Sequence, residues 1–389
     1  MQEFDVIVVG ARCAGSPTAM LLARKGYKVL LVDRATFPSD TISTHLIHPP
    51  GVASLRKWGL LNRLVATGCP AIDVYAFDMG PFVISGSPGT EDNPVSYGPR
   101  RTVLDKLLVD AAAEAGVNVR TGFTVDEILL DDGRVMGIRG HSKGGQPVAE
   151  RARVVVGADG FHSLVARAVG AEQYNEKRQL EAGYYSYWSG LPMNNRFEAY
   201  DRGDRMWAAW PTNDDLTLVI VSWPYAEFEA NKSDVEGHYL KAFDKAPKFQ
   251  QRMQAARREE RFVGMAVPNF FRKPFGPGWA LVGDAGYHKD PAAAQGITDA
   301  FRDAELLSDA LDRAFTDSRP VDEALADYAR SRDAAAMPWF RWALRFARFD
   351  ALTPPMRDFL LAIAADQEWA NRYCGLNAET VNPDEFFAS

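Results

Sequence analysis

The sequence predicts an α/β fold with a parallel sheet covered by helices, a second domain built on an antiparallel sheet, and C-terminal helices. Three observations carry this prediction. The first 33 residues read as strand, glycine-rich turn, helix and strand. Two further strand–turn–helix segments follow at residues 154–170 and 279–307. Between them, residues 183–223 consist of short apolar or alternating runs, as the strands of an antiparallel sheet do.

The chain opens with the elements of a nucleotide-binding unit. Phe4–Val9 is a β-branched apolar run typical of a buried parallel strand. Ser16–Lys25 has apolar residues at helical spacing and is closed by Gly26. Tyr27–Val32 is the next strand and ends in Asp33, about 20 residues beyond the turn, where an acid can bind a ribose hydroxyl. This order of elements predicts a Rossmann-like dinucleotide-binding domain.

The turn VVGARCAGS, residues 8–16, departs from the pattern G-x-G-x-x-G because Arg12 replaces the second glycine. Gly10 permits the tight turn, and Gly15 permits close packing of helix and strand. The N-terminus of the helix offers amide groups and a partial positive charge to a pyrophosphate. Arg12 costs some close backbone approach but adds a cation beside the phosphates. We therefore expect dinucleotide binding, the alternative being a plain strand–helix connection.

Two later segments repeat the strand–turn–helix order. VVVGADGFHSLVARAVG, residues 154–170, runs from a strand into Asp159 and then into a helix. WALVGDAGYHKDPAAAQGITDAFRDAELL, residues 279–307, runs from a strand to Asp284, through a loop with Pro291, to a helix that opens at a Gln-Gly pair. Each segment alone can be a strand–helix connection with a capping aspartate. All three in this order predict one nucleotide site.

Bulk properties exclude several classes of protein. The chain has 389 residues, of which 47% are hydrophobic and 24% charged, as in ordinary globular proteins. A formal net charge of −7 argues against a nucleic-acid partner. The N-terminus lacks the features of a signal peptide, and no apolar run is long enough for a membrane span. Three widely spaced cysteines indicate neither a disulfide framework nor a metal cluster, so we expect a cytoplasmic protein.

The three motifs together resemble those of the FAD-dependent aromatic hydroxylases, which are single-dinucleotide-fold flavoprotein monooxygenases. They also resemble those of the related geranylgeranyl reductases and flavin halogenases. The resemblance covers residues 1–75 and 95–330, and the third motif is its most specific part. It implies FAD as the cofactor. The residues that it places against FAD are Gly10, Arg12, Ala14, Gly15, Asp33, Arg34, Thr41, Ser43, Thr44, His45, Leu46, Arg101, Val125, Asp159, Gly283, Asp284, Pro291, Gly296, Ile297 and Thr298.

The same resemblance implies a role for several of these residues. Asp33 binds the ribose of the adenosine half, and Arg34 lies along the adenine. The loop Thr41–Leu46 passes beside the ribityl chain and the isoalloxazine, and Asp284 hydrogen-bonds the ribityl hydroxyls. Gly296–Thr298 present helix amides to the pyrimidine end of the flavin, where a helix N-terminus stabilises the negative charge of the reduced form.

The chain departs from the family pattern at several positions. Tyr287 replaces the usual histidine, Ala294 a glycine and Thr298 an asparagine. The second motif has Ala166 where an arginine is usual, with Arg167 one place later. That motif serves NAD(P)H as well as FAD in the hydroxylases. The departure therefore bears on whether bound NAD(P)H reduces the flavin, and not on FAD binding. Since no second dinucleotide motif is present, we expect NAD(P)H to bind transiently or to act through a partner reductase.

The aromatic strands in the middle of the chain are the expected substrate region. They comprise residues 183–190, 196–202, 205–211 and 216–223. Tyr185 and Tyr187 share one face of the first strand, and Trp207 and Trp210 flank two alanines of the third. The resemblance puts the substrate against such a sheet, so these four side chains are the candidate pocket for a flat, hydrophobic ligand. The alternative is that they only fill the core.

These assignments divide the chain into domains. Residues 1–75, 95–170 and 275–330 form the FAD-binding domain. Residues 76–94 and 171–274 form the substrate domain, and residues 331–389 a C-terminal helical segment. Within that segment, the amphipathic and basic stretch at residues 337–352 is expected to pack on the FAD-binding domain rather than on a membrane surface.

The sequence favours an FAD-dependent monooxygenase that hydroxylates or epoxidises an aromatic or other hydrophobic small molecule through a flavin peroxide. The protein then supplies position, exclusion of water and electrostatics. Asp290, Pro291 and His45 are the candidate catalytic residues because the resemblance places their loops beside the flavin. The expected co-substrates are molecular oxygen and NAD(P)H, with a flavin reductase as a further partner, and the protein is a monomer or homodimer.

Two other functional hypotheses remain open. A flavin-dependent reductase or dehydrogenase of an unsaturated, lipid-like substrate is compatible with Trp210-Pro211 and with the loop PSDTISTHLIHPPG. A halogenase is disfavoured because the sequence has no Trp-x-Trp-x-Ile-Pro element. A non-catalytic flavin-binding protein would differ from all of these in a simple test, since NAD(P)H would not bleach its flavin.

Overall fold

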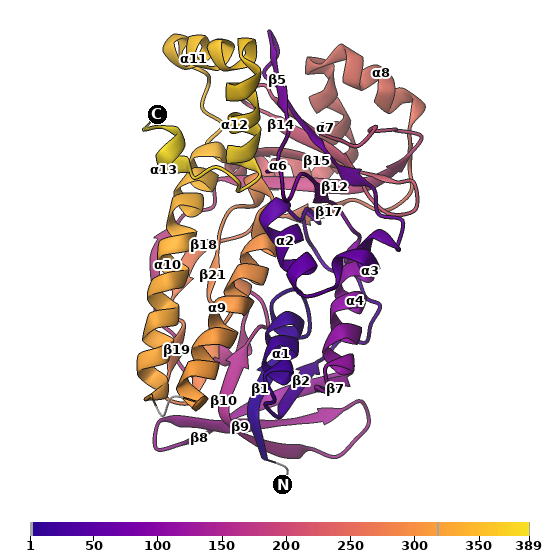
Figure 1. Cartoon of the computed structure of the whole chain (residues 1–389). Helices are drawn as coiled ribbons and strands as arrows, with labels where there is room; N and C mark the ends of the chain where they lie inside the picture. The colour runs from indigo at the N-terminus through magenta and orange to yellow at the C-terminus, as the bar shows by residue number, and fades with distance from the viewer. Residues whose placement is uncertain (1–2, 317–318, 389) are drawn as a thin grey trace.

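A computed structural model describes residues 3–316 and 319–388 (Figure 1). The molecule is elongated, with one sheet near the N-terminus and a second sheet at the opposite end. The long helices α9 (Gly296–Thr316) and α10 (Val321–Phe346) run side by side along one flank (Figure 1). The predicted α/β fold class, with C-terminal helices, is confirmed.

The sheet near the N-terminus is parallel through its centre, with the strand order β19-β20-β10-β1-β2-β7. Val6 and Val8 of β1 pack with α1 and α9, whereas Ile7 and Val9 face the antiparallel pair β8–β9 on the other side. The strands are β1 (Glu3–Val9), β2 (Val29–Asp33), β7 (Asn118–Thr121), β8 (Phe123–Asp131), β9 (Arg134–Ser142), β10 (Val148–Gly157), β19 (Phe275–Gly276) and β20 (Trp279–Leu281). The helices α1 (Gly15–Arg24) and α4 (Arg101–Glu114) cover the first face.

The second sheet has the order β16-β12-β15-β14-β13-β4-β5, with β17 also paired to β12. Its four central strands are antiparallel, as predicted, but β4 joins β13 in parallel. Its strands are β4 (Val74–Asp78), β5 (Val83–Gly86), β12 (Glu181–Ser189), β13 (Arg196–Asp201), β14 (Met206–Pro211), β15 (Thr217–Pro224), β16 (Arg257–Arg258) and β17 (Val263–Met265). One face packs against α7 (Val235–Lys241) and α8 (Pro247–Ala255), while the other packs against the C-terminal helices and against Leu46 and Ala294.

The remaining elements connect or cover the two sheets. A small sheet, β11 (Gln173–Lys177), β18 (Asn269–Arg272) and β21 (Tyr287–His288), links them. The others are α2 (Pro49–Lys57), α3 (Leu61–Val65), β3 (Ala71–Ile72), β6 (Ser96–Tyr97), α5 (Leu164–Ala168), α6 (Phe228–Asn231), α11 (Pro354–Ala365), α12 (Gln367–Asn377) and α13 (Pro383–Phe386).

Two boundaries of the predicted domain division fall inside elements. Residue 75 lies within β4, which pairs with β13 along its whole length, and residue 330 lies within α10. Neither element is divided there, because a strand or helix packs as one unit. The stretch 337–352 begins within α10, which packs on α9. Within the described ranges, none of the helices combines the length and hydropathy needed to cross a bilayer.

Candidate active site

The turn between β1 and α1 depends on two glycines. Gly10 has a φ of +104°, and a Cβ there would lie 2.3 Å from the carbonyl oxygen of Ala158. A Cβ on Gly15 would lie 1.7 Å from the carbonyl oxygen of Gly10. Both distances are far below van der Waals contact, so the backbone passes too closely for any side chain. The close approach predicted from the glycine spacing is present.

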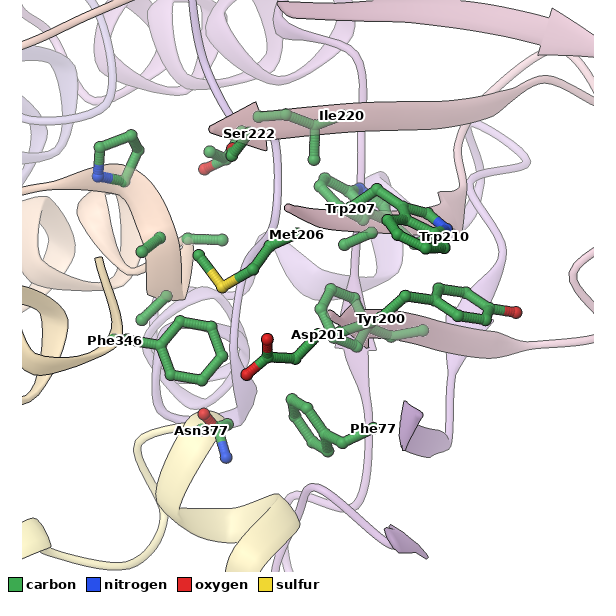
Figure 2. A pocket seen from close by; sticks show the side chains of 18 of the residues that line it. Phe77, Tyr200, Asp201, Met206, Trp207, Trp210, Ile220, Ser222, Phe346 and Asn377 are labelled. Atoms are coloured by element: carbon green, nitrogen blue, oxygen red, sulfur yellow. The ribbon is translucent and has the colours of Figure 1, made fainter. Parts of the chain in front are cut away.

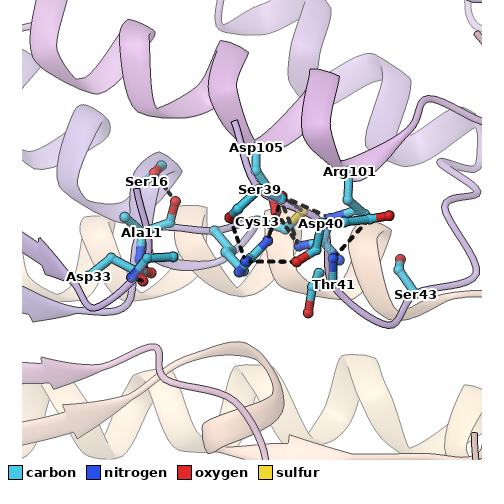
Figure 3. Close-up of polar contacts among 12 residues, drawn as sticks. Ala11, Cys13, Ser16, Asp33, Ser39, Asp40, Thr41, Ser43, Arg101 and Asp105 are labelled. Carbon is cyan, nitrogen blue, oxygen red and sulfur yellow. Dashed lines mark hydrogen bonds and ion pairs between the residues drawn. The ribbon is translucent and has the colours of Figure 1, made fainter. Parts of the chain in front are cut away.

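Asp33 closes this turn from the end of β2. Its Oδ2 accepts a hydrogen bond from the amide of Ala11 at 2.7 Å (Figure 3). Its Oδ1 accepts one from the amide of Ala35 at 2.8 Å. Each carboxylate oxygen keeps a further lone pair that a ligand hydroxyl can use. Arg34 is exposed beside it, and Val125 lies half-buried on β8. Their contacts with adenosine remain predictions.

Arg12 is anchored inside the protein. Its guanidinium lies 2.5 Å from Asp105 Oδ2 and donates to Ser39 Oγ at 3.0 Å. Asp105 is fully buried and also accepts two hydrogen bonds of 3.0 Å from Arg101, while the Cys13 thiol lies 3.4 Å away. Although burial opposes the charge of Arg101, the carboxylate of Asp105 raises the pKa of Arg101 overall. The cluster ties the turn to α4 and to the loop at residues 39–40.

Removing the Arg12 side chain should therefore lower the stability of this loop. Its effect on phosphate binding should be the smaller one. Arg12→Ala should lower the free energy of unfolding by about 1–3 kcal/mol, since charge-assisted hydrogen bonds to a buried carboxylate are lost. FAD affinity should fall only about two- to five-fold, because the ion pair with Asp105 offsets part of the charge of Arg12. Denaturant titration and FAD titration at low and high salt measure the two effects. A loss of all FAD binding in Arg12→Gly would contradict this prediction and make Arg12 an essential anchor.

His45 is a buried, neutral histidine in the loop between β2 and α2. Its Nδ1 lies 2.7 Å from the carbonyl oxygen of Ser43, which can only accept, so Nδ1 carries the proton. Its Nε2 then accepts a hydrogen bond from the Tyr187 hydroxyl at 2.7 Å. Burial and the nearby charge of Arg101 lower the pKa of His45 to about 3. His45 also has a φ of 63°, so surrounding contacts hold a strained backbone in place.

His48 ends a second chain of hydrogen bonds. Its Nε2 donates to the carbonyl oxygen of Ala293 at 3.0 Å, and its Nδ1 accepts from the Tyr75 hydroxyl at 2.9 Å. The Tyr75 oxygen lies 2.9 Å from Ser96 Oγ, which can donate to it. The amide of His48 donates to Thr298 Oγ1 at 3.1 Å. This chain ties the start of α2 to the loop before α9 and to the first turn of α9.

The third motif ends at an open helix terminus. Asp284 follows β20, its side chain is 49% exposed, and its Oδ2 lies 3.7 Å from His288 Nε2. Gln295 is 1% exposed, and neither polar atom of its side chain has a hydrogen-bond partner within the described ranges. A Cβ added to Gly296 would meet no atom within 4 Å. The first amides of α9 have no partner inside the helix, so this terminus can receive a polar ligand.

A cavity of about 740 Å³ of empty volume, partly open to solvent, lies between the second sheet and the loop before α9 (Figure 2). Its walls are mainly aromatic and apolar, with Phe77, Phe197, Trp210 and Phe346 among the lining residues. Pro291–Ala294 form one wall.

The predicted pocket residues are only partly brought together. Trp210 lines the cavity. Trp207 also borders it, but its ring stacks on Tyr200 at 5.0 Å in the cluster that faces α7 and α8. Tyr185 and Tyr187 lie against His45, each with ring centroids 5.7 Å from the imidazole, and are not among the described residues that line this cavity. They contact the predicted flavin loop through His45, and their contact with a substrate stays a prediction.

Comparison with known proteins decides the family. A family model described as an FAD binding domain matches residues 3–343. The chain belongs to this FAD-binding family. It is therefore an FAD-binding oxidoreductase, and the resemblance stated from the motifs is confirmed.

Individual relatives carry different activities. The chain is 26% identical over 376 residues to a digeranylgeranylglycerophospholipid reductase of Methanothrix thermoacetophila, covering 93% of this chain and 88% of the relative. The solved structure of the flavin-dependent brominase Bmp2 matches with a TM-score of 0.85 at 17% identity, covering 100% and 98%. That of Pseudomonas aeruginosa PqsL with 2-aminobenzoylacetate matches with a TM-score of 0.75 at 21% identity, covering 96% and 99%. At identities of 17% and 21%, the two solved structures show only that this chain shares their fold.

The residues of the three motifs fit FAD. Gly10 and Gly15 leave room only for backbone at the turn, which opens a helix N-terminus to a pyrophosphate. Among the described residues the buried side-chain amide of Gln295 has no partner, and the space beside Gly296 is open, so the polar edge of a flavin ring would fit there. Asp159 contributes a buried oxygen, Oδ1, that has no partner among the described residues.

Asp284 offers a direct test of this fit. Asp284→Ala should remove a charge-assisted hydrogen bond to the ribityl chain, worth about 1.5–3 kcal/mol, and lower FAD affinity roughly ten- to a hundred-fold. Asp309→Ala, which removes an exposed carboxylate from α9, is the matched control. FAD titration by flavin fluorescence measures both variants. An unchanged dissociation constant in Asp284→Ala would place the ribityl chain elsewhere.

Several residues of the site were missed from the sequence. Asp105 follows Arg101 by one helical turn, and their i, i+4 spacing could have predicted this ion pair from the sequence. Tyr75, Phe77 and Phe346 reach the cavity from β4 and α10, and no local pattern indicated this. Glu181 also lines the cavity, although its position at the start of a strand carried no signal.

Proposed function

We propose that the protein is an FAD-dependent monooxygenase that hydroxylates or epoxidises an aromatic or hydrophobic small molecule. One observation supports this most directly: the aromatic cavity is bounded by Pro291–Ala294, immediately before the first turn of α9. FAD held by the three motifs would present its ring there, so an apolar substrate in the cavity would lie against it. Bound FAD supplies the oxygen-activating redox chemistry.

The chain's own residues would position the substrate and exclude water. Phe77, Phe197 and Trp210 offer flat faces to a ring, and aromatic pairs favour stacked or edge-to-face arrangements. His45 and His48 are neutral, so they add no cation beside the flavin. Their hydrogen bonds to Tyr187 and Ala293 hold the two flavin-facing loops in fixed positions.

Electron supply is part of the same proposal. NAD(P)H would be the donor, either by transient binding or through a separate flavin reductase, and molecular oxygen would be the co-substrate. A second candidate is a flavin-dependent reductase of an unsaturated, lipid-like substrate. It is favoured by the relative in Methanothrix thermoacetophila, whose name states such an activity and which aligns with 93% of this chain.

Product mass separates the two candidates. FAD-loaded protein is incubated with NAD(P)H, with and without an added flavin reductase, and a panel of aromatic and isoprenoid compounds under ¹⁸O₂. A monooxygenase yields a product that carries one labelled oxygen atom. A product that has gained two hydrogens and no label would overturn the proposal in favour of the reductase, and unreacted compounds with persistently oxidised flavin would indicate a non-catalytic protein.

A further inference from the structure

Asp201 places a carboxyl group inside the aromatic cavity. It ends β13, and in Figure 2 its carboxyl group points toward Phe346, with Phe77 and Asn377 on the same side. Its Oδ1 accepts a hydrogen bond from the amide of Gly203 at 2.7 Å, whereas its Oδ2 accepts none from the described residues. One oxygen of this carboxyl group is therefore open to a ligand in the cavity.

The cation that follows Asp201 in the sequence binds other groups. Arg202 Nη2 lies 2.8 Å from Asp78 Oδ1, and its Nη1 donates to the backbone carbonyl oxygens of Asp78 and Asp201 at 2.7 and 2.8 Å. Burial raises the pKa of the Asp201 carboxyl, and the nearby charge of Arg202 offsets only part of this effect. The described side chains that line the cavity include no lysine or arginine, so no cation on its walls pairs with this carboxylate.

A second acidic side chain in the same cavity also lacks a partner. Glu181, the first residue of β12, is 3% exposed and lines the cavity, and its Oε2 has no hydrogen-bond partner within the described ranges. A buried polar atom without a partner is costly, so a ligand that donates a hydrogen bond to it is favoured. The remaining walls are largely aromatic, and the face of an aromatic ring attracts cations. The cavity therefore favours a ligand that brings hydrogen-bond donors and a positive charge.

We propose that the cavity binds a hydrophobic molecule that carries a basic amine, and that the carboxylate of Asp201 is the contact for its ammonium group. The ammonium group donates to Asp201 Oδ2 beside the rings of Phe77 and Phe346, while the apolar body of the molecule extends toward Pro291–Ala294. Attraction to the carboxylate offsets the loss of hydration of the cation, which a wall of apolar groups alone would not do. A ligand with its own carboxylate would meet like charge and is disfavoured. This inference rests on the proposed function in one respect, since it places the substrate in this cavity.

Three naphthalene probes of similar shape test the charge preference. At neutral pH, 2-naphthylmethylamine is a cation, 2-naphthylmethanol is uncharged and 2-naphthoate is an anion. Calorimetry with the oxidised, FAD-loaded protein should show that the amine binds about ten-fold more tightly than the alcohol, and that the naphthoate binds more weakly than either. Equal affinities of the amine and the alcohol for the wild-type protein would overturn the proposal.

Variants of the two acidic residues test which of them binds the amine. Asp201→Asn keeps the shape of the side chain and an acceptor for the amide of Gly203, but removes the charge. It should reduce the preference for the amine to about two-fold or less and leave the affinity for the alcohol unchanged, which also shows that the cavity is intact. Asp214→Asn, which removes an exposed carboxylate between β14 and β15, is the matched control and should keep the preference. Glu181→Gln should keep most of it. A preference that is lost in Glu181→Gln but kept in Asp201→Asn would overturn the assignment to Asp201.

These binding measurements need no turnover, so they separate this inference from the proposed function. An amine preference that depends on Asp201, without any oxygenated product, would count against the proposed function alone. An oxygenated product together with equal affinities for the amine and the alcohol would count against this inference alone.

Discussion

Replacing Gly15 with alanine should abolish both stable folding of the nucleotide-binding turn and FAD binding. The new Cβ would lie 1.7 Å from the carbonyl oxygen of Gly10 and 3.1 Å from the Cβ of Ala158. The first of these neighbours is backbone at the end of β1, which is paired in parallel with β10, so it cannot move without breaking the sheet. We expect the free energy of unfolding to fall by about 4 kcal/mol or more.

A second glycine variant separates the fold from the cofactor. Gly296→Ala adds a Cβ that meets no protein atom within 4 Å, so its thermal unfolding should match wild type. Its FAD affinity should nevertheless fall, because the added methyl group enters the space proposed for the flavin. Thermal unfolding and FAD titration are measured for both variants. A Gly15→Ala protein with wild-type stability would show that the turn does not have this close approach.

The sequence predicted the first nucleotide-binding unit to within about two residues because each element is bounded by a strong local signal. The β-branched run that forms β1 ends at Val9 before Gly10, and α1 ends at Arg24, with Lys25 as its C-cap before Gly26, which has a φ of 92°. The four aromatic runs likewise became antiparallel strands. The parallel pairing of β4 with β13 was not predicted, because it joins segments more than 100 residues apart. Local sequence patterns do not specify which residues of two such distant strands pair.

The candidate site shows the same limit. The turn and Asp33 were found from spacing, because both lie in one continuous motif. The ion pair of Arg12 with Asp105 was missed, since it joins residues 93 positions apart in the sequence. The place of Glu181 at the cavity was missed for a similar reason. Only the folded chain brings the start of β12 against the loop before α9, and a lone acidic residue in a sequence is usually a solvated one.

Acidification should destabilise the protein through its two neutral, buried histidines. Burial lowers the pKa of His45 to about 3 and that of His48 to about 4. In the unfolded chain both titrate near 6.5, so below that pH the unfolded state binds more protons than the folded state. Their contribution to stability is therefore complete above about pH 6.5 and is lost as the pH falls toward the folded values.

Buried carboxyls act with the opposite sign over part of the same range. Burial raises the pKa of Asp290 to about 7 and that of Glu379 to about 8. Each stabilises the folded state when it is protonated, and this contribution is lost as the pH rises from the unfolded value through the folded one. The wild-type profile is the sum of both effects. A variant that removes one histidine is needed to separate them.

His45→Asn is suited to this purpose because asparagine tolerates the positive φ of position 45. Between about pH 6.5 and about pH 4.5, His45 should account for a loss of about 2–3 kcal/mol in wild type. The His45→Asn profile, measured by urea unfolding at each pH, should be flatter by that amount, even though the lost bond to Tyr187 lowers stability at every pH.

Tyr187→Phe removes the same bond but keeps the imidazole, so it should lower stability without flattening the curve. His162→Asn controls for the loss of an exposed imidazole. If the profiles of wild type and His45→Asn ran parallel, His45 would not be the neutral group that links acidity to unfolding.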